Sequence, residues 1–165
     1  MVAAFTLALT APGAIAARQA SKATADPALA SAIAGEINAA RQTRGKGGLA
    51  VSGQLATAAR QHALQMGRLG YFSHTSADGS GPTRRITSYY AVHGIHWSVG
   101  EVLLWTSGNT SASEAVAHWL ASAPHARELL GRWRELGVAA VHVDDAPGVY
   151  GGQDVTILVA DFGRR

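Results

Sequence analysis

The 165-residue chain has no cysteine, which excludes disulfide bonds, cysteine metal ligands and thiol chemistry. Charged residues are scarce, because Asp, Glu, Lys and Arg make up 15% of the chain against about 25% in a typical globular protein. The net charge is only +3, and the arginines are scattered, with just two adjacent pairs. Nucleic-acid-binding proteins usually show a clustered basic surface, so we expect no nucleic-acid partner.

The chain also has no apolar run of the roughly 20 residues that a transmembrane helix needs. Residues 2–11 are apolar and are followed by Ala14-Ile15-Ala16, which resembles the A-x-A cleavage site of a signal peptide. No Lys or Arg precedes the run, and the alternative is a disordered or buried N-terminus. We expect a signal peptide over residues 1–17, a flexible tether over 18–27 and one domain over 28–163, secreted or held at the cell envelope.

Two helices are predicted in the first half of the chain. Asp26 followed by Pro27 is a typical helix start, and apolar residues then recur at helical spacing up to Ala40. Ser52 begins a second helix, which ends at Gly70. His62 lies on the apolar stripe of this helix, so we interpret it as a core histidine. A loop over 71–83 and a short helix over 84–92 follow.

The second half of the chain combines strands and helices. Apolar residues alternate along a predicted strand, with Ile95, Trp97, Val99, Leu103 and Trp105 on one face. A capping box predicts a helix from residue 111 with Trp119 on its inner face, and a proline separates it from one or two further turns over 125–130. Strands over 136–143 and 155–162, joined by a turn over 144–148, complete an α+β fold. Helices on both sides of a small antiparallel sheet predict a three-layer α/β/α sandwich.

Three residues are candidates for a functional site. His74 lies in a Gly- and Ser-rich loop, which the aromatic residues Tyr71 and Phe72 would anchor to the core. Glu101 would share a face with apolar residues if its strand is continuous, and a buried acid needs a partner, for which a nearby histidine is the natural choice. A strand broken at Gly100 would instead leave Glu101 in solvent. His125 follows a proline at a helix start, where it could also be an ordinary surface residue.

Four short motifs occur in a fixed order along the chain: Phe72-Ser73-His74, Gly100-Glu101, Trp119-x-x-Ser122-x-x-His125 and Phe162-Gly163. Together they resemble the bacterial, cysteine-free, SCP-like extracellular branch of the CAP superfamily (cysteine-rich secretory, antigen 5 and pathogenesis-related proteins). The resemblance runs from about residue 28 to 163. It implies the same α/β/α sandwich and a surface cleft in which His74, Glu101 and His125 converge. Tyr71, Trp97, Trp119 and Ser122 are further candidates for the ligand-binding wall.

The chain departs from the family pattern at three places. Val102 stands where asparagine usually follows Gly-Glu, and Pro124 is shifted next to His125. The second acid of the family's His-Glu-Glu-His tetrad is missing after Trp119, and Glu114 is already explained by the capping box. A zinc site usually needs three or four protein ligands, so His74 and His125 would hold zinc only weakly.

Three functions remain open from the sequence. The first is a non-enzymatic module that binds a small apolar or cell-envelope ligand in the cleft, since relatives have been linked to lipids and cell walls. The second is a metal-assisted hydrolase of peptide or ester bonds, with Glu101 as general base and His74 and His125 as ligands. The third is a purely structural role for the polar cluster. Ser122 lacks the oriented base that a serine nucleophile needs, and we interpret both His93-x-x-His96 and Asp161-Phe162-Gly163 as coincidences.

Overall fold

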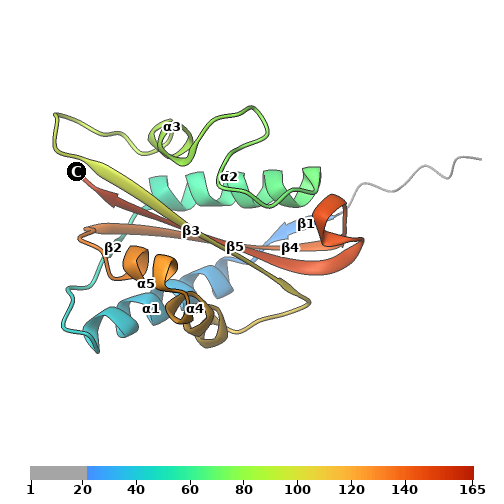
Figure 1. Cartoon of the computed structure of the whole chain (residues 1–165), viewed down its shortest axis with the longest axis horizontal. Helices are drawn as coiled ribbons and strands as arrows, with labels where there is room; N and C mark the ends of the chain where they lie inside the picture. The colour runs from blue at the N-terminus through green and yellow to red at the C-terminus, as the bar shows by residue number, and fades with distance from the viewer. Residues whose placement is uncertain (1–21) are drawn as a thin grey trace, which may run out of the picture.

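The computed structural model describes residues 22–165, so the predicted signal peptide and the first part of the predicted tether lie outside the described residues. In chain order the elements are β1 (Ala23–Ala25), α1 (Pro27–Gln42), β2 (Ala50–Val51), α2 (Gly53–Leu69), α3 (Pro82–Thr87), β3 (Ser98–Ser107), α4 (Ala112–Ala121), α5 (Ala123–Leu129), β4 (Glu135–Ala146) and β5 (Gln153–Arg164). Figure 1 shows a central sheet with α2 and α3 on one face and α1, α4 and α5 on the other. The predicted α/β/α sandwich is confirmed.

The sheet leaves β3 at an edge. The strand order is β1-β4-β5-β3, and the short β2 pairs with β4 in parallel. β3 pairs with β5 alone, in an antiparallel register that runs from Ser98 opposite Arg164 to Ser107 opposite Val155. Among the described residues, nothing pairs with the other side of β3. Side chains from both helical layers can therefore meet along this free edge.

The alternation along β3 agrees with the sequence analysis from residue 99 onward. Val99, Leu103 and Trp105 pack with residues of the α2–α3 layer, whereas Val102 and Leu104 pack with α1 and α4. The strand is continuous through Gly100. The prediction is wrong before the strand: Ile95 is 88% exposed, because residues 93–97 form a loop.

The predicted tether over residues 18–27 is wrong for its second half, which belongs to the folded domain. Residues Ala23–Ala25 form β1, which pairs antiparallel with β4 opposite Val141–Val143. The Asp26 amide donates a hydrogen bond to the Ala140 carbonyl, and the Asp26 carboxylate accepts one from the Leu29 amide, 2.9 Å away. The predicted helix cap at Asp26 is confirmed. The residues directly before this cap already form a strand of the sheet.

Two prolines begin helices that the sequence analysis placed differently. Pro82 lies in the first turn of α3, which therefore starts before Arg84 and ends at Thr87. Pro124 lies in the first turn of α5, which begins directly after α4. Proline is favoured at this position because its nitrogen has no hydrogen bond to lose there. The predicted capping box of Ser111 and Glu114 at the start of α4 is confirmed.

The sheet and α2 are in direct contact at a glycine. A Cβ atom at Gly137 on β4 would lie 2.0 Å from the backbone nitrogen of Ala56 and 2.2 Å from the backbone carbon of Leu55. Both atoms belong to the first turns of α2, which starts at the cap residue Ser52. The missing side chain therefore sets how closely α2 approaches the sheet. None of the helices in the described part of the chain is both long enough and apolar enough to cross a membrane.

We expect Gly137→Ala to destabilise the fold by at least about 2 kcal/mol, because the backbone of α2 must move away from β4. Gly35→Ala is the matched control: Gly35 is exposed inside α1, and a Cβ there meets no atom within 4 Å. Alanine at a helix interior should stabilise by roughly 0.5–1 kcal/mol relative to glycine. Urea unfolding of both variants measures the two effects, and equal stabilities would contradict this account.

Candidate functional site

Glu101 is a buried carboxylate with two partners. It is 7% exposed on the α2–α3 side of β3, as the sequence analysis expected for a continuous strand. Its Oε1 atom lies 2.7 Å from Nδ1 of His74, and its Oε2 atom accepts a hydrogen bond from Nη2 of Arg85. The predicted pairing with a histidine is confirmed, and Arg85 is an additional partner that the sequence analysis missed.

Arg85 also holds the loop that carries His74. Its Nη1 atom donates hydrogen bonds to the His74 carbonyl oxygen, 2.9 Å away, and to Oγ of Ser76, 2.8 Å away. One buried guanidinium thus joins α3, the loop and β3. In the sequence, nothing distinguishes Arg85 from its neighbour Arg84, which is exposed.

The charge state of Glu101 sets the tautomer of His74. Burial alone would raise the pKa of Glu101, but the hydrogen bond with His74 and the charge of Arg85 outweigh it, and the pKa lies below its usual value. An ionised carboxylate only accepts, so Nδ1 of His74 must carry the proton. In the neutral ring the lone pair is then on Nε2, and the side chain is 51% exposed. The pair therefore presents an imidazole of fixed tautomer at the surface.

A second acid, Asp161, lies directly across the sheet from Glu101. The two residues are register partners on β3 and β5, and Asp161 is fully buried. Neither of its oxygens has a hydrogen-bond donor among the described residues. Burial, and next the negative charge of Glu101, raise the pKa of Asp161 well above its usual value. Asp161 is thus the neutral member of the pair.

The sequence pattern around Asp161 could have identified it as a buried acid. Asp161 is a single acid within the apolar run Ile157–Ala160 and Phe162, which is the same pattern that identified Glu101. The motif Asp161-Phe162-Gly163 was set aside as a coincidence. Its match to a kinase motif is unrelated to this position, but the carboxyl group of Asp161 lies beside the candidate site.

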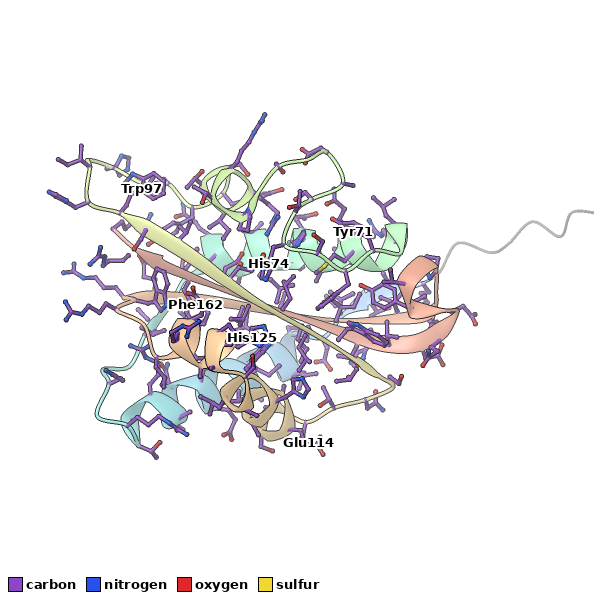
Figure 2. The ribbon with its side chains drawn as sticks, viewed as in Figure 1. Tyr71, His74, Trp97, Glu114, His125 and Phe162 are labelled. Carbon is purple, nitrogen blue, oxygen red and sulfur yellow. The ribbon has the colours of Figure 1, made fainter. Side chains whose placement is uncertain are left out.

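His125 comes close to His74 from the opposite layer. It lies near the start of α5, half-buried, and its pKa is lowered by burial and next by the charge of His74. Figure 2 shows His74 and His125 on either side of β3. Within residues 22–165, His125 makes no hydrogen bond to His74 or Glu101, and its buried Nδ1 atom has no partner. The structure brings His74 and Glu101 into contact, with His125 as a neighbour.

Glu128 is a further acid at this edge that the sequence analysis missed. A Cβ atom at Gly100 would lie 2.6 Å from Oε2 of Glu128, so glycine makes room for this carboxylate beside β3. Burial raises the pKa of Glu128, and the charge of His74 acts in the opposite direction. Glu128 follows His125 by three residues on α5, a spacing that places two side chains on one helix face. This spacing in the sequence could have identified Glu128 as a candidate site residue.

Burial excludes one of the expected wall residues. Trp119 is completely buried in the core, and its Nε1 atom donates a hydrogen bond to the Leu103 carbonyl oxygen, so its assignment to the ligand-binding wall is wrong. Tyr71 is half-buried, and its hydroxyl donates to Gln65. Ser122 is the junction of α4 and α5. Figure 2 shows Glu114 on the outer side of α4, well away from His74.

The predicted core histidine, His62, is confirmed. It is 1% exposed, and its Nε2 atom lies 2.9 Å from the carbonyl oxygen of Ser73, directly before His74. Burial lowers the pKa of His62 to about 4, so the ring is neutral at pH 7.

Candidate metal ligands do not form a cluster in the described part of the chain. No group of three or more His, Cys, Asp or Glu side chains is placed to hold one metal ion. His74 and His125 would be the complete set of histidine donors, fewer than the three that zinc usually takes from a protein. The residues present therefore do not fit a resident zinc ion.

Comparisons with known proteins were made by sequence and by structure. The family model "CAP: Cysteine-rich secretory protein family" matches residues 34–162, and no curated protein matches the chain by sequence. Similar solved structures include an outer surface protein from Borrelia burgdorferi, with 23% identity and a TM-score of 0.62 over 81% of this chain and 90% of that one.

Two further structures are similar over 85% of this chain. One is an extracellular protein with an SCP domain from Bacillus anthracis, with 23% identity and a TM-score of 0.66. The other is a cysteine-rich secretory protein from Staphylococcus aureus, with 15% identity and a TM-score of 0.57. This chain spans 41% and 39% of their lengths, and at these identities the likeness concerns the fold alone.

We expect Asp161→Asn to become more stable than the parent protein as pH rises. Unfolded Asp161 ionises above pH about 4, whereas the folded state keeps it protonated because its pKa is raised. The parent protein therefore loses stability with rising pH until the folded pKa is reached, by at most about 1.4 kcal/mol per pH unit. The amide of asparagine is close in size to the carboxyl group but does not titrate.

Urea unfolding between pH 4 and pH 8 measures this difference. The contribution of His62 titration is common to both proteins and cancels. Asp144→Asn, at an exposed position, is the control and should follow the parent protein at every pH. A stability difference for Asp161→Asn that does not change with pH would show that Asp161 is ionised in the folded state.

Proposed function

The chain belongs to the CAP (cysteine-rich secretory protein) family, and on that basis we propose that it is a secreted, non-enzymatic module that binds a cell-envelope ligand at His74, Glu101 and His125. The observation that carries the proposal is the imidazole of His74, which is half-exposed while its tautomer is held by a buried carboxylate. A histidine fixed in this way offers an oriented hydrogen-bond acceptor at Nε2. Secretion is supported by the outer-surface and extracellular proteins that share the fold.

The composition of the site favours a polar ligand. With Trp119 in the core, the apolar wall expected from the sequence is reduced to the half-buried Tyr71 and Trp97. The remaining groups near His74 are the polar side chains of His125 and Glu128, and burial is the main cause of the pKa shift of each. Hydroxyl and amide groups suit such surroundings better than a sterol or acyl chain does. A peptidoglycan fragment therefore fits the site better than an apolar ligand.

The second candidate function, hydrolysis, depends on groups beside the Glu101–His74 pair. A hydrolase needs a nucleophile or a metal-activated water. Ser122 makes no side-chain hydrogen bond as the cap of α5, and the described residues form no three-ligand metal cluster. The Glu101–His74 pair could still act as a general base, which keeps hydrolysis as the second candidate.

Muramyl dipeptide is a soluble probe for the proposed ligand class. We expect it to shift the ring Cε1–H resonances of His74 and His125 together in a saturable NMR titration. His74→Ala should weaken binding about ten-fold, the cost of one hydrogen bond to a well-placed acceptor. His96→Ala, at an exposed histidine in the loop before β3, is the control and should bind like the parent. Titration without shifts at His74 would instead favour a purely structural role for the cluster.

A calorimetric zinc titration separates the second candidate from the first. We expect no stoichiometric binding at micromolar zinc, because only two histidine donors are in place. The control is the double variant His74→Ala, His125→Ala, which should give the same trace as the parent protein. One zinc ion bound by the parent and lost in the double variant would favour the metal-assisted hydrolase.

A further inference from the structure

A separate hollow lies between α2, α3 and the loop that joins them. Its volume is about 480 Å³, within the range of small-molecule sites, and Figure 1 shows α2 and α3 as neighbouring elements on one face of the sheet. His74, Glu101 and His125 do not line it. Its polar lining includes Gln61, Gln65, Arg68, Ser80, Arg84 and Tyr89.

The net charge of the hollow is positive. Arg68 and Arg84 are exposed, and neither guanidinium has a hydrogen bond or an ion pair with any residue between 22 and 165. The only acid in the lining is Asp78. Its carboxylate already accepts hydrogen bonds from the amide and the hydroxyl of Ser80, at 2.9 and 2.7 Å. The hollow thus has two arginine side chains without a hydrogen-bond partner among residues 22–165, and one carboxylate that already accepts hydrogen bonds.

The other polar groups of the lining also offer donors. Oε1 of Gln65 accepts hydrogen bonds from the Tyr71 hydroxyl and the Ala77 amide, so the uncommitted part of Gln65 is its NH₂ group. The hydroxyl proton of Ser80 is already donated to Asp78. Arg68, Arg84 and the Gln65 amide together supply more donors than the two oxygens of a carboxylate accept, and the oxygens of a phosphate suit them better.

Two buried side chains of the same lining have an unpartnered nitrogen. Nδ1 of His62 and Nε of Arg85 have no hydrogen-bond partner in the described structure, and these residues are only 1% and 8% exposed. Nε2 of His62 faces the Ser73 carbonyl oxygen and must donate to it, so Nδ1 is an acceptor, whereas Nε of Arg85 is a donor. Buried polar atoms are nearly always satisfied. A hydroxyl group can satisfy both kinds of atom, because it donates and accepts, but both nitrogens are closed to solvent, so the lining must shift when the ligand binds.

We propose that this hollow binds a polyol phosphate, with the phosphate on Arg68 and Arg84 and a hydroxyl group on the side of His62 and Arg85. The site is distinct from the His74 edge and does not depend on the function proposed there. Arg85 borders both, since it lines the hollow and donates a hydrogen bond to Glu101.

The probe for this proposal is sn-glycerol 3-phosphate, titrated into the full chain by calorimetry and amide NMR at constant ionic strength, because salt screens exposed charges. We expect one binding event, with amide shifts around Ser80 and Arg84. Inorganic phosphate should bind several-fold more weakly, and glycerol should not bind. Equal affinity for inorganic phosphate and glycerol 3-phosphate would contradict the role of the hydroxyl group.

Three arginine variants test the location. Arg68→Gln and Arg84→Gln should each lower the affinity about ten-fold or more, as expected for a charge-assisted hydrogen bond. Arg60→Gln is the matched control, since Arg60 is an exposed arginine of α2 outside this hollow, and its affinity should stay unchanged. All three side chains are exposed, so the variants should fold. An equal loss in all three, or amide shifts confined to other parts of the chain, would overturn the proposal.

Discussion

The buried carboxylate of Glu101 is the constraint around which one end of the molecule is organised. An ionised acid in an apolar layer is stable only with compensating partners, and these are His74 from the loop and Arg85 from α3. Asp161 on β5 lies directly opposite Glu101 in the strand register. Removing one partner of such a buried pair typically costs about 3–5 kcal/mol. The loop, α3 and the edge strand are therefore held as one unit.

The protonation of this cluster balances its charge. Glu101 and Arg85 form an ion pair, while Asp161 stays neutral because two facing carboxylates cannot both be ionised without a large cost. His74 then completes the cluster from the solvent side, with its free nitrogen outward. Val102, which stands where the family motif usually has asparagine, is fully buried among residues of α1 and α4, so its side chain points away from Glu101.

The edge position of β3 determines how the two histidines approach each other. His74 belongs to the α2–α3 layer and His125 to the α4–α5 layer, and a strand with a neighbour on its free side would keep them apart. The absence of a side chain at Gly100 leaves space for Glu128 beside the strand. Arg85, finally, is shared by the His74 edge and by the hollow between α2 and α3, so a change at one of these places can affect the other through one guanidinium.

The sequence by itself determined the features that depend on neighbouring residues. The helix starts at Asp26 and Ser52, the capping box at Ser111, and the alternation of β3 around Glu101 all follow from local spacing, and the structure confirms them. Burial of an acid on an apolar face also predicted that Glu101 needs a partner. The family motifs, rather than the local pattern, pointed to His74.

Only the tertiary structure decided which residues surround Glu101. Arg85 lies 16 residues before Glu101 and Asp161 lies 60 residues after it, and a local pattern shows that an acid is buried without showing what lies opposite it. Trp119 was misplaced for the same reason, since a tryptophan on an inner helix face can line a cleft or fill a core. Its indole nitrogen donates a hydrogen bond to the Leu103 carbonyl oxygen in the core. Spacing determines which face a side chain takes, but packing between layers determines its partners.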